Sequence, residues 1–193
     1  WLFAIPPVFS DTDAMSRYFD RLKEPLKGKD LEDLEMMLRL REMVPAFFKK
    51  CVGDILRSRP KVVGFSCTFN QRVPALVLAR MLKLEDPAIK IIVGGTYMDG
   101  VMGEAFSKAF DWVDVTVRGE GEKIIPGLLR DLLSAEQTVT PQPGLCTRNG
   151  ERLDIHPESP ETKADLNALP VPDYDEYFER IAGTELEQPG NIN

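Results

Sequence analysis

The stretch VVGFSCTFNQRVPALVLARMLK, residues 62–83, is typical of a buried β-strand that runs directly into an α-helix. Its first five residues are mostly β-branched or aromatic, and apolar residues recur at helical spacing from Val73 onward. Small uncharged polar groups fill the junction between the two elements, from Ser66 to Gln71. The stretch therefore predicts a strand–loop–helix unit whose loop carries hydrogen-bonding groups.

Two similar units follow along the chain. IKIIVGG precedes a helix expected over 102–110, and DVTVRG precedes another over 124–133. Strands that alternate with helices predict a parallel sheet with right-handed crossovers, and continuous apolar strands predict helices on both faces. We therefore expect an α/β fold, a Rossmann-like (flavodoxin-like) parallel sheet with helices on both faces. An N-terminal helical segment precedes it, and a C-terminal hairpin and a linker follow.

The chain divides by pattern into three segments. Residues 1–58 form the N-terminal helical segment, 59–156 form the Rossmann-like core plus hairpin, and 157–193 form a proline-rich acidic linker. Since three strands make a thin sheet, either the opening WLFAIPPVF joins as an edge strand or the first strands lie before it. Asn149-Gly150 predicts a hairpin with a type I′ turn.

Helix signals in the first segment predict two helices. One runs from Thr12 to Lys23 after a cap at Asp11. The other begins at Asp30, and Pro45 should kink it or split it in two.

Composition excludes several classes of protein. The net charge of −7 without a basic cluster argues against binding of nucleic acid or of an anionic membrane. No apolar run is long enough to span a membrane. The three cysteines are widely spaced, which indicates neither a metal site nor a disulfide framework and fits a cytoplasmic protein. We predict no catalytic and no metal-binding residue. His156 lies in a proline-rich segment and is expected to be a solvated side chain, and Cys67 has no histidine nearby in the sequence to activate it as a nucleophile.

The candidate binding residues lie in the three loops that follow the strands. Ligands of open parallel sheets bind outside the carboxyl ends of the strands, so these loops are expected to meet. The first offers uncharged donors and acceptors, the second offers paired glycines, and the third places carboxylates where a phosphate would otherwise bind. The residues are Ser66, Cys67, Thr68, Asn70, Gln71, Gly94, Gly95, Thr96, Gly119, Glu120, Gly121 and Glu122.

Each loop also has a purely structural interpretation. Thr68 or Asn70 could cap the next helix, the paired glycines could form a tight turn, and Glu122 could interact with a helix dipole. The third loop fails the dinucleotide-binding fingerprint, and the chain has no P-loop lysine motif.

Taken in order, VVGFSCTFNQ, IIVGGTYMDGVMGEAF, VDVTVRGEGE and LPVPDYDEYF resemble the cobalamin-binding region of B12-dependent radical SAM enzymes. The likeness is greatest to the C-methyltransferases that mature ribosomally made peptides. It implies a domain that holds methylcobalamin base-off, with its dimethylbenzimidazole nucleotide tail against the sheet. By resemblance, Ser66, Cys67 and Thr68 line the slot for the tail, Gly94 and Gly95 let it approach, and residues 119–122 close the pocket.

The resemblance also implies partners outside this chain. The parent enzyme would carry a radical SAM domain in the same polypeptide, with a 4Fe–4S cluster and S-adenosylmethionine, beginning just after PDYDEYF. The substrate would be a precursor peptide or a small molecule, and this fragment alone is expected not to be catalytic. The Asp-x-His-x-x-Gly motif that supplies a cobalt ligand in other B12 domains is not present.

Two other functions are compatible with the sequence. One is a flavodoxin-like signalling domain, and the other is a vestigial B12-like domain that docks a precursor peptide or another partner. If the chain binds cobalamin, we expect Gly95→Val to weaken that binding while leaving the strand intact.

Overall fold

The structure is a computed structural model that describes residues 2–25 and 27–184, without the side chains of 12–15, 29, 31 and 166. The part of the linker beyond 184 therefore lies outside the described residues. The chain forms two compact units, residues 1–163 and 164–193.

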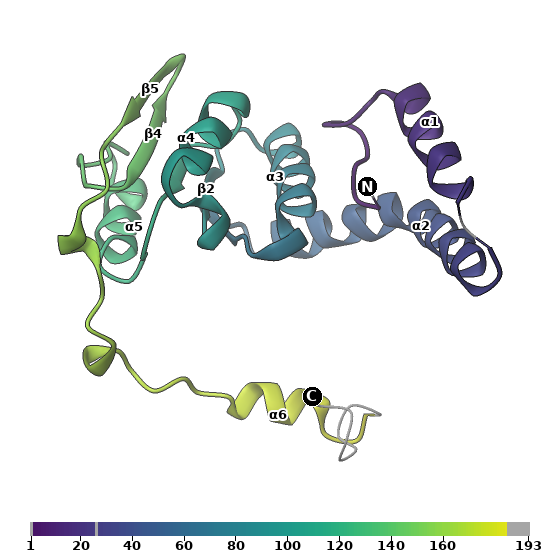
Figure 1. Ribbon diagram of the computed structural model, residues 1–193. Coiled ribbons are helices and arrows are strands. Elements are labelled where there is room, and N and C mark those ends of the chain that lie inside the picture. The colour runs from purple at the N-terminus through teal and green to yellow at the C-terminus, as the bar shows by residue number, and fades with distance from the viewer. Residues whose placement is uncertain (1, 26, 185–193) are drawn as a thin grey trace. The chain divides into compact units, whose positions relative to one another are not determined.

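Five strands form one sheet in the first unit, in the spatial order β1-β2-β3-β4-β5. The first three strands pair in parallel, with Ser66 beside Gly94 and Ile92 beside Val115. The last two strands form the expected hairpin (Figure 1). Its first strand, β4, pairs with β3 in antiparallel fashion. The strands are β1 (Val62–Ser66), β2 (Lys90–Gly94), β3 (Val115–Val117), β4 (Leu145–Asn149) and β5 (Arg152–Ile155).

Helices cover both faces of this sheet, as the sequence predicts. On one face α3 (Arg72–Glu85) and α4 (Gly100–Ala109) bury an apolar cluster that includes Leu82, Ile91 and Met98. On the other face α5 (Ile125–Leu133) buries a second cluster around Leu128 and Leu145. The predicted α/β, Rossmann-like fold is confirmed, with the hairpin as an antiparallel extension of the parallel strands.

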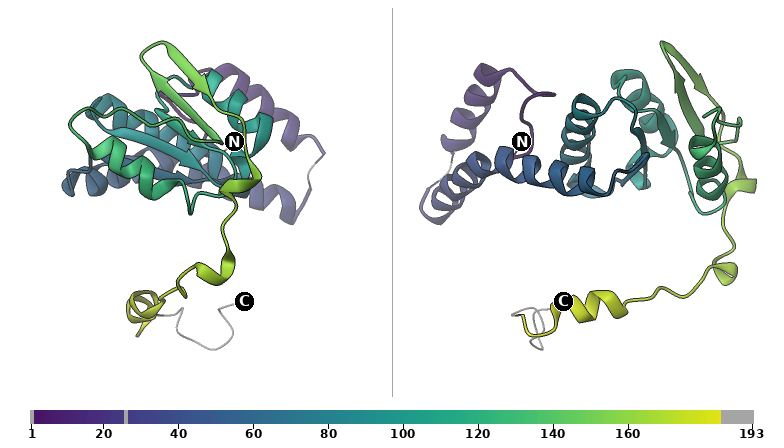
Figure 2. Two further views of the ribbon diagram at one scale, coloured as in Figure 1. Left: turned by 90° about the vertical axis from the view of Figure 1, so that its left-hand side faces the viewer. Right: turned by 180° about the vertical axis from the view of Figure 1, so that it is seen from behind.

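The N-terminal segment forms two helices, α1 (Thr12–Lys23) and α2 (Lys29–Arg57). The first has its predicted bounds. The second remains one helix across Pro45, so the predicted split does not occur. The helix α2 packs against α3, with Val44 and Phe48 of α2 beside Val77 of α3, and the two helices cross in the right-hand view of Figure 2.

The apolar opening does not join the sheet. Its residue Ile5 is buried with Val44 and Phe48 of α2 and with Val77 of α3. The guanidinium of Arg41 donates to the carbonyls of Leu2 and Ala4 at 3.0 and 2.6 Å. These bonds satisfy backbone groups that a strand would pair, and β1 is consequently an edge of the sheet among the described strands.

The hairpin turn differs from the predicted one by a residue. Asn149 pairs with Arg152, so the two loop residues are Gly150 and Glu151. Only Gly150 has a positive φ, of 61°, whereas a type I′ turn needs positive φ at both loop residues. The positive φ of Gly150 favours a glycine in this turn, but Gly150 occupies the first loop position and not the predicted second.

The second unit contains the short 3₁₀ turn η4 (Leu166–Ala168) and the helix α6 (Asp175–Ile181). The rings of Tyr177 and Phe178 contact each other, with centroids 5.3 Å apart. Within residues 2–25 and 27–184, the helices are all too short or too polar to cross a bilayer.

A charged contact at the amino end of the sheet joins β2 to β3. The Asp114 carboxylate, only 18% exposed, lies 2.8 Å from Lys83 Nζ and accepts a 2.7 Å hydrogen bond from the backbone of Ile91. We predict that Asp114→Ala lowers the free energy of unfolding by about 2 kcal/mol, because the Lys83 amine, 14% exposed, and the buried Ile91 amide both lose this acceptor. Chemical denaturation followed by circular dichroism measures this change.

The control is Asp154→Ala, which removes an exposed ion pair with Arg152. Its cost should stay below about 1 kcal/mol, since exposed pairs contribute little. Equal losses in both variants would show that the Asp114 contact is no stronger than a surface pair.

Candidate functional site

A cavity of about 840 Å³ lies at the carboxyl end of the three parallel strands, on the face that α5 covers. Pockets that bind small molecules and cofactors commonly measure about 300–1,000 Å³. All three strand-following loops contribute to its lining, as the topology of a parallel sheet requires. The expected meeting of these loops is therefore present in the structure.

The floor of the cavity is formed by residues of β1, β2 and β3 that point toward α5. Gly64 and Ser66 of β1 lie beside Ile92 and Gly94 of β2, and Val117 of β3 completes the row. A Cβ atom built on Gly64 would meet nothing within 4 Å, and one built on Gly94 would meet only Val117. Because Gly64 and Gly94 have no side chains, the space above them is left open, and the cavity occupies it.

Hydrogen bonds to backbone amides hold the walls of the cavity together. The Cys67 amide donates to the Gly94 carbonyl at 2.7 Å, which brings the first two loops into direct contact. The Gly119 amide donates to the Asp99 carboxylate at 2.8 Å, which ties the third loop to the second. The three loops thus form one connected rim.

Eight of the twelve sequence-predicted residues line this cavity. They come from all three loops, and the largest group belongs to the loop after β3. They are Ser66, Gly94, Gly95, Thr96, Gly119, Glu120, Gly121 and Glu122.

The other four predicted residues lie elsewhere. Cys67 is fully buried in the core under α3. The Thr68 hydroxyl and amide both donate to Gln71 Oε1 at 2.9 Å, which forms a capping box at the 3₁₀ turn η1 (Phe69–Gln71). Asn70 lines a separate, smaller cavity of about 410 Å³ beside Leu2 and Phe3. The structural interpretation thus accounts for Thr68 and Gln71.

The rim of the large cavity is acidic. Asp99, Glu120, Glu122 and Glu158 line it, and Lys163 is the basic residue among the described lining residues. The floor between them is apolar or bare except for the hydroxyl-bearing Ser66. The cavity is therefore suited to a flat uncharged group that lies on the floor and carries hydrogen-bond donors at its edge.

Sequence reasoning missed several lining residues, among them residues from two unexpected parts of the chain. Gly64 lies inside a strand, where a glycine carries no ligand signal of its own, although an interior glycine often marks a close approach. The second part is residues 158–163, predicted as linker, of which Glu158, Ser159, Pro160, Thr162 and Lys163 line the cavity. No local pattern could have placed this segment there.

Neither the three cysteines nor His156 are among the described residues that line the cavity. Burial raises the pKa of the Cys67 thiol, and Arg72 nearby opposes that shift. Burial likewise raises the pKa of Cys146, which is 1% exposed. His156 is half-buried directly after β5, and its backbone amide donates to the Leu145 carbonyl at 2.9 Å. Among the described residues, no three His, Cys, Asp or Glu side chains cluster as metal ligands do.

The fold and the cavity define an α/β domain with a pocket at the carboxyl edge of its parallel strands. The chain belongs to the B12-binding domain family: the family's sequence model, described as B12 binding domain, matches residues 25–129. That match begins just before α2 and ends within α5.

Two curated relatives agree with this assignment. One is the 2-(S-pantetheinyl)-carbapenam-3-carboxylate methyltransferase of Streptantibioticus cattleyicolor, 31% identical over 91 residues, or 47% of this chain and 13% of that protein. The other is the cobalamin-dependent radical SAM methyltransferase TokK of Streptomyces tokunonensis, 29% identical over 100 residues, or 52% of this chain and 14% of that protein. The matched region spans about one seventh of these relatives.

Gly95 is required by the fold, which overturns the expectation that Gly95→Val leaves the strand intact. Its φ is +94°, and a Cβ there would lie 2.8 Å from both the amide nitrogen and the carbonyl oxygen of Cys67. We predict that Gly95→Ala lowers the free energy of unfolding by about 2–4 kcal/mol through backbone strain and overlap. Gly64→Ala is the matched control and should change it by less than about 1 kcal/mol, measured by urea denaturation.

Cysteine labelling tests the environment of Cys67. Because burial raises its pKa, the group stays a protonated thiol at pH 8 and is shielded from reagent. We predict that iodoacetamide modifies the half-buried Cys51 first and leaves Cys67 and Cys146 intact in the folded chain. Peptide mass spectrometry quantifies each site, with the urea-unfolded chain as the control for equal reactivity. Preferential modification of Cys67 would contradict its burial.

Proposed function

We propose that this chain is the cobalamin-holding module of a B12-dependent radical SAM methyltransferase. It holds the cofactor base-off, with the dimethylbenzimidazole nucleotide tail in the 840 Å³ cavity. The observation that carries the proposal is the bare floor over Gly64 and Gly94, at the carboxyl edge of the sheet, in a chain of the B12-binding family.

The lining residues suit such a ligand. The flat benzimidazole would lie over Gly64, which has no side chain, and against the apolar side chains of Ile92 and Val117. Carboxylates at the rim, including Glu120 and Glu122, would accept hydrogen bonds from ribose hydroxyls and from the amides of the corrin side chains. Lys163 would balance the phosphodiester of the tail.

Each of the three loops would then contact a different part of the ligand. The first and second loops present Ser66 and Thr96, which both donate and accept, to the groups above the floor. The third loop closes the cavity from the side of α5. When bound, methylcobalamin supplies the methyl group, and this chain contributes binding and orientation.

The whole protein would contain parts that lie outside this chain. The name of one relative, a cobalamin-dependent radical SAM methyltransferase, favours a radical SAM domain in the same polypeptide. Such a domain would bring a 4Fe–4S cluster and S-adenosylmethionine. The substrate carbon belongs to a peptide or a small molecule. The carbapenam carboxylate in one relative's name favours the small molecule.

Filling the floor of the cavity tests the proposal. Gly64→Val adds three carbons where a Cβ meets no atom within 4 Å, and valine suits a strand. We predict that the wild-type chain changes the absorption spectrum of hydroxocobalamin on binding, and that Gly64→Val weakens this binding by roughly tenfold or more. The melting temperature should stay within about 3 °C of wild type.

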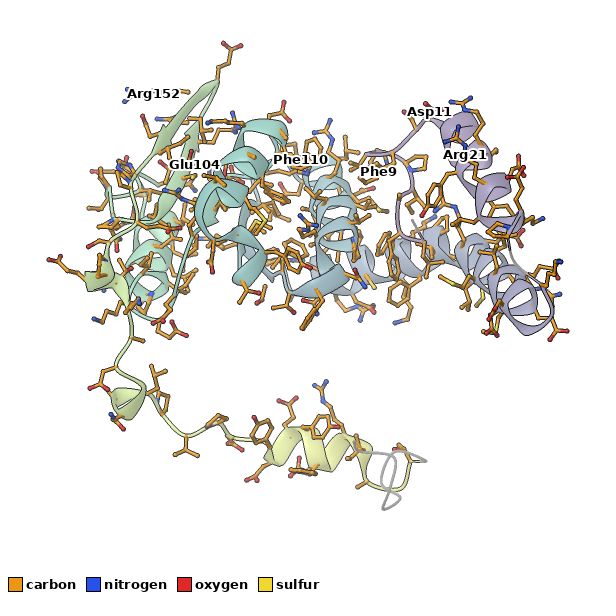
Figure 3. The ribbon with its side chains drawn as sticks, viewed as in Figure 1. Phe9, Asp11, Arg21, Glu104, Phe110 and Arg152 are labelled. Atoms are coloured by element: carbon orange, nitrogen blue, oxygen red, sulfur yellow. The ribbon has the colours of Figure 1, made fainter. Side chains whose placement is uncertain are left out.

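A valine at another edge strand provides the control. Arg152→Val places the same side chain on β5, where Arg152 lies at the outer end of the hairpin (Figure 3), away from the cavity lining. It should bind hydroxocobalamin like the wild type. The cofactor assignment would be refuted if the hydroxocobalamin spectrum stayed unchanged both with the wild-type chain and with a longer protein that includes the radical SAM domain. That result would favour a docking module. Binding of flavin mononucleotide instead would favour a flavodoxin-like role.

A further inference from the structure

The fourth wall of the cavity comes from residues 156–163, which we call the strap. The strap follows β5 and contains the 3₁₀ turn η3 (Pro160–Thr162). Five of its residues line the cavity, although the family match ends at residue 129. The strap is thus a part of the binding site that the family assignment does not cover.

A buried arginine fixes the start of the strap. The Arg118 side chain is 3% exposed and donates to the Glu104 carboxylate at 2.7 Å. Its other terminal nitrogen donates to the carbonyl of His156, the first residue of the strap. Figure 3 shows Glu104 on the side of α4 that faces the β4–β5 hairpin. Because a buried guanidinium is costly without acceptors, Arg118 holds the His156 carbonyl firmly in place.

A second contact fixes the middle of the strap to the start of α4. The Glu158 carboxylate accepts a 2.8 Å hydrogen bond from the Gly100 amide, one of the first amides of that helix. Helix starts carry unsatisfied amides and partial positive charge, so a carboxylate stabilises them. Glu158 also lines the cavity, so its position depends on this contact.

A third contact reaches the strap from outside the cavity. Lys123 Nζ donates to the Glu161 carbonyl at 3.1 Å, from the loop that precedes α5. Lys123 is exposed and does not line the cavity. It can therefore be changed without altering the surface that a ligand touches.

We propose that the strap is a docked wall that retains the ligand, with Arg118, Glu158 and Lys123 as its positioning residues. This inference rests on the proposed function for the identity of the ligand. Because five strap residues line the cavity, a ligand that fills it contacts the strap, and undocking of the strap removes those contacts and speeds the departure of the ligand. The stability of the three contacts then sets the dissociation rate.

The test changes Lys123 in the full chain. Lys123→Ala removes the outer contact, and Lys123→Arg restores a donor that can reach the same carbonyl. Lys61→Ala is the matched control, since Lys61 is an exposed lysine before β1, at the opposite end of the sheet from the cavity. Two quantities are measured: hydrogen exchange of the strap amides without ligand, and the dissociation rate of hydroxocobalamin by stopped-flow absorption.

We expect Lys123→Ala to speed both processes by about fivefold, the loss that one hydrogen bond of ordinary strength implies. Lys123→Arg and Lys61→Ala should behave like the wild type. A dissociation rate that is the same in Lys123→Ala and the wild type would overturn the proposal. So would strap amides that exchange as fast as an unstructured peptide in the wild-type chain.

Failure of the proposed function gives a different pattern. If the wild-type chain does not bind hydroxocobalamin, the cofactor assignment and the retaining role of the strap are both refuted. Exchange in the ligand-free chain still reports whether the strap is docked, because that measurement needs no ligand.

Discussion

Parallel pairing of β1, β2 and β3 is the constraint on which the site depends. It brings the ends of three strands to one edge, although the strands are separated in sequence by whole helices. The close approach of Gly95 to the backbone of Cys67 then joins the first two loops. With these loops held by backbone atoms, the side chains at their tips can serve a ligand rather than the fold.

The cavity exists because glycines replace large side chains on one face of the sheet. On the face under α3 and α4, large side chains such as Leu82 and Ile91 fill the space. On the face under α5, β1 contributes Gly64 and Ser66 instead. A glycine in a strand weakens that strand, so its place here is a cost to stability that ligand binding can offset.

Charge is distributed unevenly between the floor and the rim. Apolar groups form the floor, whereas carboxylates on three separate segments surround it. Two of these carboxylates, Asp99 and Glu158, also accept hydrogen bonds from the Gly119 and Gly100 amides. Some carboxylates of the acidic rim therefore connect loops by accepting hydrogen bonds from backbone amides. The rim also presents acceptors that suit a ligand with many hydrogen-bond donors.

The sequence by itself determined the α/β class, the order of strands and helices, and the edge at which the loops meet. These follow from local periodicity and from the rule that parallel strands share their carboxyl ends. The family resemblance likewise depended on the ordered loop motifs. The glycine at the hairpin turn was expected, but its position within the turn was set by strand register.

Only the tertiary structure decided which polar residues face the cavity. Thr68 and Gln71 bond to each other, Cys67 enters the core, and Gly64 becomes part of the floor. Residues 158–163 reach the site through Arg118 and other contacts that span dozens of residues. Local patterns carry no record of such long-range contacts, because each depends on how complete elements pack against one another.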